Sequence, residues 1–175
     1  LDRIYPVILV LISASLMMIV SLRSNYILGD DINEEYYLFF STQAHSIWFP
    51  DPTLLLNSAL SISILPTVFK NFIFTDPQLL YKLLFPLLSL LTPLIIYTLV
   101  RKYFSGILAL FAACFYIFQR FFVGISLNPR TSVAIIFFAL TILVLCNKEL
   151  TNAKKYAMLL LFITGGVLSH YTSSF

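Results

Sequence analysis

Residues 77–102 read PQLLYKLLFPLLSLLTPLIIYTLVRK, an apolar run that Asp76 precedes and a pair of cations ends. An acid followed by proline is a typical helix start, because the carboxylate accepts from free backbone N–H groups and proline has no N–H to satisfy. About 20 apolar residues in a helix cross the hydrocarbon core of a bilayer, which is about 30 Å thick. The run therefore predicts a transmembrane helix over 77–100, with Pro86 and Pro93 as tolerated kinks.

The composition of the whole chain supports a membrane location. Of its 175 residues, 59% are hydrophobic and 11% are charged, whereas soluble domains carry about 25% charged residues. Further apolar runs predict spans at 4–22, 106–125, 129–146 and 156–172. We expect an all-α, polytopic integral membrane protein with about five transmembrane helices, forming one module of a longer chain. The net charge of +3 is spread over loops and indicates no nucleic-acid partner.

The short loops predict the orientation of these spans. Five cations lie in two loops of the same parity: Arg101, Lys102, Lys148, Lys154 and Lys155. By the positive-inside rule these loops are cytoplasmic. The N-terminus is then cytoplasmic and the loop at 23–76 is extracellular, provided that residues 54–74 do not cross. If they do cross, the chain has six spans and the loop lies inside; Asn57, Pro66 and Lys70 favour five.

The loop at 23–76 holds most of the acidic residues. Residues 28–37 read LGDDINEEYY, and Asp30 or Asp31 is expected to cap a helix that reaches about Ser46. One side of this helix would carry Asp31, Glu34, Glu35, Thr42 and His45, and the other Ile32, Tyr36, Phe39, Phe40 and Ile47. The spacing predicts an amphipathic helix at the membrane interface, with Trp48 as an aromatic anchor.

Three kinds of group would then meet at the outer membrane edge. The carboxylates of Asp31, Glu34 and Glu35 suit a general base or a divalent cation. Arg130 stands two positions after Asn128 at a predicted helix start, where a phosphate is favoured. His170 could join either group, so a metal would be held by Asp31, Glu35 and His170. The bland alternatives are that Asp31 and Glu34 form only a capping box and that Arg130 marks only the end of a span.

The acidic motif after a first span resembles the N-terminal part of the C-type membrane glycosyltransferases, which take sugars from polyprenyl-phosphate donors. In that superfamily the first external loop carries the catalytic acid and commonly holds two interfacial helices. The resemblance implies that Asp31 is the catalytic base, with Glu35 and Glu34 as acidic companions. It also implies membrane lipid and a lipid-linked sugar phosphate as partners.

Three short motifs are similar to an uncharacterised archaeal family of predicted multi-span proteins. They are Gly29-x-Asp31-Ile32-x-x-Glu35-Tyr36, Asn57-Ser58 to Leu65-Pro66, and Ser169-His170-Tyr171-Thr172. Arg130, His170 and Tyr171 are the residues that we expect to bind the substrate phosphate.

Two other functions fit the same sequence. A multi-span transporter or lipid flippase would use the prolines of its helices as mobile points. A structural membrane subunit would use the acidic loop to dock a partner. The enzyme hypothesis predicts transfer of a sugar from a polyprenyl-phosphate donor at the outer membrane face.

Overall fold

The computed structural model describes residues 2–49 and 55–170, and in these residues the chain forms helices and no β-strand. The helices are α1 (Tyr5–Ser21), α2 (Asp30–His45), η1 (Leu55–Ser58), α3 (Leu60–Phe72), α4 (Pro77–Ser89), α5 (Leu91–Arg101), α6 (Gly106–Ile117), α7 (Arg120–Gly124), η2 (Ile125–Leu127), α8 (Pro129–Leu145) and α9 (Asn152–Ser169). The predicted all-α class is therefore correct for the described part of the chain.

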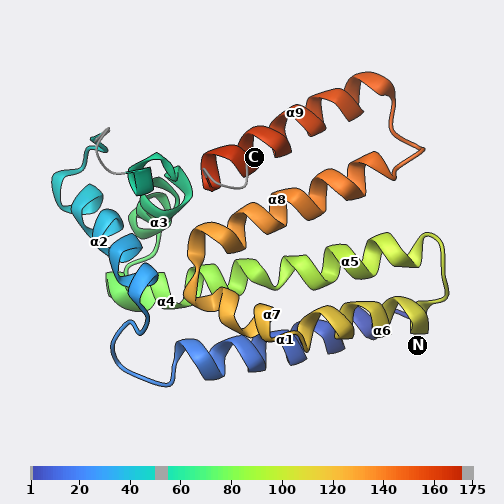
Figure 1. The fold of residues 1–175 in the computed structure, drawn as a ribbon, viewed down its shortest axis with the longest axis horizontal. Coiled ribbons are helices and arrows are strands. Elements are labelled where there is room, and N and C mark those ends of the chain that lie inside the picture. Colours follow the sequence, from blue (N-terminus) through green and yellow to red (C-terminus); the bar gives the residue numbers. More distant parts are fainter. Residues whose placement is uncertain (1, 50–54, 171–175) are drawn as a thin grey trace.

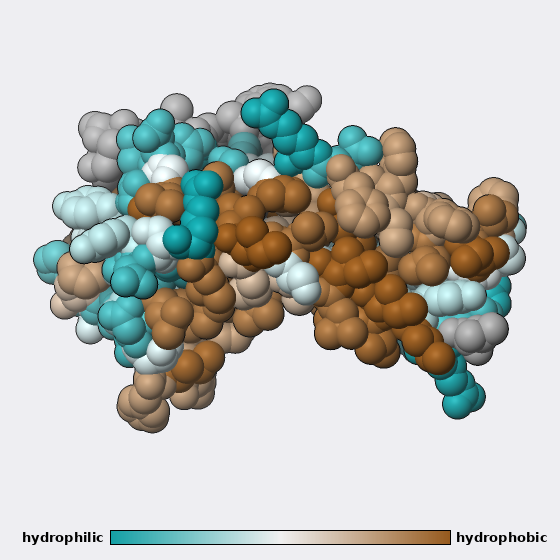
Figure 2. Space-filling model, turned by 90° about the horizontal axis from the view of Figure 1, so that it is seen from below, coloured by the Kyte–Doolittle hydropathy of each residue, from teal (hydrophilic) through white to brown (hydrophobic). Residues whose placement is uncertain are grey.

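Most of the helices run along one axis, and α2 and α3 gather at one end of it. Figure 1 shows α1, the α4–α5 pair, α6, α8 and α9 running back and forth along the long axis, with α2 and α3 together at the left. Apolar side chains cover the middle of the face in Figure 2, and hydrophilic ones gather mainly towards the α2–α3 end. This distribution is the one expected of a bundle whose middle lies in lipid.

The helix pair α4–α5 runs through the middle of the bundle. Pro77–Arg101 covers 25 residues and is the one described helix that is both long enough and apolar enough to cross a membrane, since it extends about 37 Å. Asp76 caps it as predicted, because its Oδ2 accepts from the backbone N–H of Leu79 at 2.9 Å. The pair divides at Leu90, where the ring of Pro93 disturbs the carbonyl of Ser89 four residues earlier.

Three shorter apolar helices accompany this pair: Tyr5–Ser21, Gly106–Ile117 and Pro129–Leu145. The segment predicted as a span over 106–125 is not one continuous helix in the structure. Helix α6 ends at Ile117 and a separate short helix, α7, begins at Arg120. Gln119 stands between them and its side chain donates back to the carbonyl of Phe115 at 3.1 Å. The break leaves Arg120 exposed, so that its charge avoids burial between apolar helices.

The segment whose crossing the sequence left open forms η1 and α3. Helix α3 has 13 residues and therefore extends about 20 Å, well short of a bilayer core. Before it, the Asn57 side chain accepts from Trp48 Nε1 at 3.1 Å and donates to the carbonyl of Phe49 at 2.6 Å. These bonds fold the segment back on the end of α2, and α3 packs against α2.

Close packing joins α8 to α9 through a glycine. A Cβ at Gly165 would lie 2.7 Å from Cζ of Phe137, whereas the neighbouring Gly166 leaves ordinary contact distances. Close contact between the two helices therefore depends on Gly165 rather than on Gly166. The contact brings the end of α9 towards the start of α8, where Arg130 lies.

Candidate functional site

The acidic helix α2 starts on a glycine rather than on an acid. Gly29 is the N-cap residue and has φ 127°, a backbone conformation that side-chain-bearing residues rarely adopt. The Asn33 side chain donates back to the Gly29 carbonyl. Asp30 and Asp31 lie in the first turn, so the predictions that one of them caps the helix and that Asp31 and Glu34 form a capping box are wrong. Their negative charges still interact favourably with the positive end of the helix dipole.

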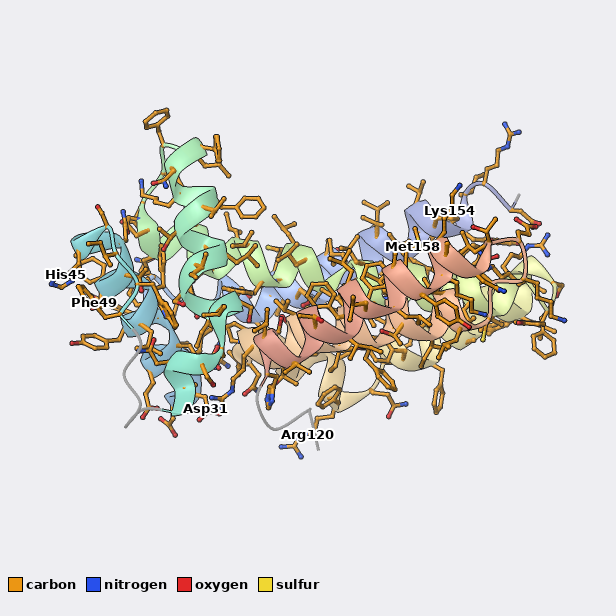
Figure 3. The ribbon with its side chains drawn as sticks, turned by 90° about the horizontal axis from the view of Figure 1, so that it is seen from above. Asp31, His45, Phe49, Arg120, Lys154 and Met158 are labelled. Atoms are coloured by element: carbon orange, nitrogen blue, oxygen red, sulfur yellow. The ribbon has the colours of Figure 1, made fainter. Side chains whose placement is uncertain are left out.

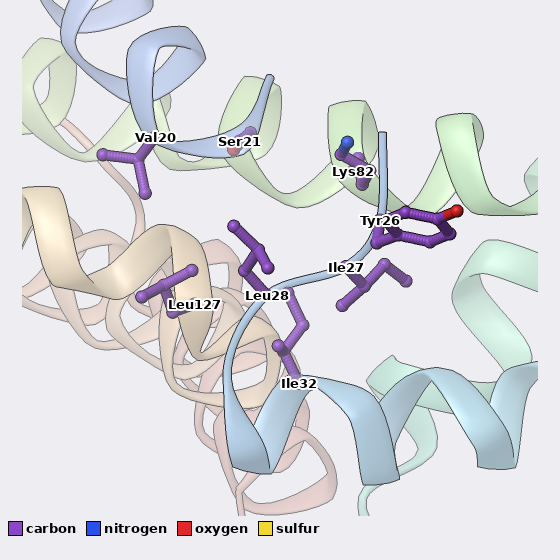
Figure 4. A pocket seen from close by; sticks show the side chains of 8 residues that line it. All are labelled: Val20, Ser21, Tyr26, Ile27, Leu28, Ile32, Lys82 and Leu127. Atoms are coloured by element: carbon purple, nitrogen blue, oxygen red, sulfur yellow. The ribbon is translucent and has the colours of Figure 1, made fainter. Parts of the chain in front are cut away.

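The loop that leads into α2 is held by two side chains of α4. Lys82 donates to the carbonyl of Ser24, and Gln78 donates to the carbonyl of Asn25 at 2.7 Å. Figure 4 shows the small hollow beneath this loop, with Lys82 and Tyr26 on one side and Leu127 opposite. Because Lys82 is 8% exposed, its ammonium is kept from water and satisfied by the loop backbone. Lys82 thus fixes where α2 begins.

Aromatic rings then dock α2 on α4. The ring of Tyr81 lies 5.4 Å from that of Tyr36 and 5.6 Å from that of Phe39, both measured between centroids. Phe39 and Tyr81 are fully or almost fully buried, and Ile32 joins the same apolar cluster. Rings at these separations attract each other beyond their burial. The contact sets the rotation of α2 and therefore the direction in which each acid points.

Glu35 lies on the buried side of α2, which corrects the predicted assignment of faces. Its side chain is 0% exposed and shares the buried side with Ile32 and Phe39. Glu35 is three residues after Ile32 and four before Phe39, a spacing that puts all three on one side of a helix. Sequence periodicity grouped it with the polar residues because a buried carboxylate is unexpected without a partner.

The partner of Glu35 is the start of α8. Its Oε1 lies 3.3 Å from Nε of Arg130, and its Oε2 accepts from the backbone N–H of Arg130 at 3.4 Å. The carboxylate therefore occupies the anion site at the N-terminus of α8. Burial raises the pKa of Glu35 to about 7, and the nearby guanidinium offsets only part of that effect.

Asp31, one turn before Glu35, contacts the same guanidinium from the outside. Its Oδ2 accepts from the Arg130 guanidinium at 3.1 Å. The Asp31 side chain is 57% exposed and that of Arg130 is 15% exposed. An ion pair this open contributes about 0.2–1 kcal/mol. Arg130 therefore joins two carboxylates of α2, one buried and one facing solvent.

The other predicted site residues lie around this cluster. His170 follows the last residue of α9, is partly buried, and is close enough to Arg130 for their charges to interact. Glu34 is exposed and lines an open hollow with Tyr37 and Leu56, apart from the ion pairs. Tyr171 lies outside the described residues. Figure 3 shows Asp31 at the α2–α3 end and Lys154 towards the other.

The predicted metal set is not assembled in the described structure. Within residues 2–49 and 55–170, no three His, Cys, Asp or Glu side chains group closely enough to hold a metal ion. Glu35 is engaged with Arg130, which leaves Asp31 and His170 short of a ligand set. The residues of this site that the structure describes therefore do not fit a divalent cation.

Sequence inspection missed three residues that build the site. Gly29 starts α2, Lys82 fixes its entry loop, and Tyr81 supplies a hydroxyl that is buried near the Glu35 and Arg130 charges. Within the described residues the Tyr81 hydroxyl has no hydrogen-bond partner. A lysine in the second turn of an apolar helix was the one available signal, because such a charge requires an acceptor.

The fold and its ion-pair cluster define an α-helical membrane protein with a polar site at one end of the bundle. Residues 67–175, well over half of the chain, match the family model described as dolichyl-phosphate-mannose-protein mannosyltransferase, and the chain belongs to this family. The match supports a membrane glycosyltransferase-like function and confirms the resemblance at that level. No curated protein and no solved structure matches the chain. The matched region includes Arg130 and His170 and begins after α2.

Proposed function

We propose that the protein transfers a sugar from a polyprenyl-phosphate donor at the outer membrane face, with Asp31 as the catalytic base. The observation that carries this proposal is the contact between Asp31 and Arg130. Arg130 lies in the region that matches the mannosyltransferase family, and Asp31 comes from outside it. The contact joins a solvent-facing carboxylate to a cation that suits a phosphate.

The arrangement of the helices supports an outer location for this site. The proposed crossing segments are those that run along the long axis of the bundle in Figure 1, namely α1, α4–α5, α6 with α7, α8 and α9, whereas α3 lies with α2 at one end. Helices α2 and α3 then share one side of the membrane with the start of α8. The cationic loops near Lys102 and Lys154 lie on the opposite side, which the positive-inside rule assigns to the cytoplasm.

In the proposed reaction each charged group of the site has one role. Asp31 accepts the proton of an acceptor hydroxyl, whose oxygen attacks the anomeric carbon of the donor sugar. The bond between that carbon and the phosphate oxygen breaks, and its electron pair stays on the polyprenyl phosphate that leaves. Arg130, with His170 close enough for their charges to interact, stabilises that phosphate. We propose that Tyr171, the residue after His170 in the chain, binds the same phosphate. Glu35 holds Arg130 in place.

The family name supplies the first donor to test. The family is named for dolichyl-phosphate-mannose, so we propose a polyprenyl-phosphate mannose as the donor for this chain. Glu34, exposed on α2 beside Glu35, would face the acceptor side of the site rather than the phosphate.

The test compares two neighbouring acids of α2. Asp31→Asn is expected to lower transfer of labelled mannose by about 10²- to 10⁴-fold, the usual effect of losing a general base. Asp30→Asn is the matched control, because Asp30 is exposed and forms no ion pair within residues 2–49 and 55–170. Transfer is measured in membranes after equal insertion of both variants is verified. Transfer by Asp31→Asn at the rate of the control would refute the proposed base.

A further inference from the structure

The two carboxylates on Arg130 differ in how they can be reached. Glu35 makes two contacts, with Nε and with the backbone N–H, and its side chain is 0% exposed. Asp31 makes one contact, at 3.1 Å, from a side chain that is 57% exposed. A molecule that arrives from solvent or from the outer leaflet therefore meets Asp31 first, and Glu35 only behind the guanidinium.

The exposed contact is also the one that a phosphate can replace. Exposed ion pairs are weak because water screens them and both side chains lose freedom in forming them. A phosphate offers several charged oxygens, and the planar guanidinium binds two of them in parallel. The buried contact is protected, because α4 packs through Tyr81 against the side of α2 that carries Glu35.

We infer that the donor phosphate takes the place of Asp31 on Arg130, and that this exchange frees the carboxylate for the acceptor. While its Oδ2 accepts from Arg130, the carboxylate is held beside the guanidinium; once the phosphate has replaced it, the side chain can turn towards an acceptor hydroxyl. Binding of the donor thus releases the carboxylate that then acts as the base in the transfer of that donor's sugar. Glu35 stays against Arg130 throughout and is a positioning residue. The inference rests on the proposed function and adds an order of events to it.

The exchange predicts the direction in which phosphate affinity changes when Asp31 is replaced. If Asp31 competes with the phosphate, its removal tightens phosphate binding while it abolishes transfer. The contact is an exposed ion pair, so the expected gain in affinity is about two- to fivefold. A base that does not contact Arg130 would lose transfer without this gain.

The experiment titrates polyprenyl monophosphate, and separately inorganic phosphate, into the full chain in nanodiscs. Asp31→Asn is expected to bind both ligands about two- to fivefold more tightly than the wild type. Asp30→Asn removes an equal charge one residue away and is expected to change affinity by less than about twofold, since screening weakens distant exposed charges. In an Arg130→Gln background, Asp31→Asn is expected to give no gain.

Three outcomes overturn the exchange. The first is unchanged or weaker binding by Asp31→Asn, and the second is an equal gain in Asp30→Asn, which would reflect net charge alone. The third is a gain for the lipid but not for inorganic phosphate, because the exchange concerns the phosphate group. The transfer assay separates the two proposals. Active Asp31→Asn refutes the base, whereas an inactive variant with unchanged affinity refutes only the exchange.

Discussion

Replacement of Glu35 by glutamine tests how much the burial of a carboxylate lowers the stability of this fold. The pKa of Glu35 is raised from 4.5 to about 7, with burial as the main cause. The folded state therefore holds this proton more tightly than the unfolded state does. Stability of the wild type should fall as pH rises from about 4.5 to about 7, and level off above that.

The size of the effect follows from the two pKa values. Their difference of about 2.5 pH units corresponds to about 3 kcal/mol, at 1.36 kcal/mol per unit. Glu35→Gln has no proton to lose, and its side-chain oxygen can still accept from the backbone N–H of Arg130. The variant should match the wild type near pH 4.5 and exceed its stability by up to about 3 kcal/mol at pH 8.

Thermal unfolding in detergent between pH 4.5 and 8 measures this difference. For a chain of this size, about 3 kcal/mol corresponds to a rise in Tm of about 6–12 °C. Glu34→Gln is the matched control, because Glu34 is exposed on the same helix; its pH profile should follow the wild type. A loss of about 3–5 kcal/mol by Glu35→Gln at pH 8 would refute the reasoning, since the ion pair with Arg130 would then outweigh its desolvation.

Two further experiments test the arrangement of the helices. With Cys114 and Cys146 replaced by alanine, Asn33→Cys should react with a membrane-impermeant thiol reagent in intact cells, and Lys154→Cys only after permeabilisation; reaction of both from one side would contradict the five-span arrangement. Gly165→Ala should destabilise the α8–α9 pair by about 1–3 kcal/mol, because its Cβ would overlap the ring of Phe137. Gly124→Ala, which meets no atom within 4 Å, is the control for thermal unfolding, and equal stability of the two variants would count against close packing at Gly165.

Local sequence patterns predicted the helices that burial in lipid requires. The apolar run after Asp76 and the apolar segment before Leu22 are both helical in the structure, because a backbone in lipid must satisfy its own hydrogen bonds. The acids of residues 30–35 were correctly recognised as part of one helix. The break within the segment at 106–125 was not predicted. Hydropathy does not register a side-chain hydrogen bond such as the one from Gln119 to the carbonyl of Phe115, beside which α6 ends.

The sequence by itself determined that this chain is a helical membrane protein with an acidic helix after its first apolar helix. Composition and apolar length suffice for that, because the bilayer sets both. Only the tertiary structure decided that Glu35 is buried and that Asp31 meets Arg130, 99 residues away in sequence. The rotation of α2 depends on its aromatic contact with Tyr81 and on the loop that Lys82 holds. Contacts of this kind join segments that are distant in sequence, so they produce no periodic pattern from which they could be predicted. These contacts determine which acid of α2 faces water.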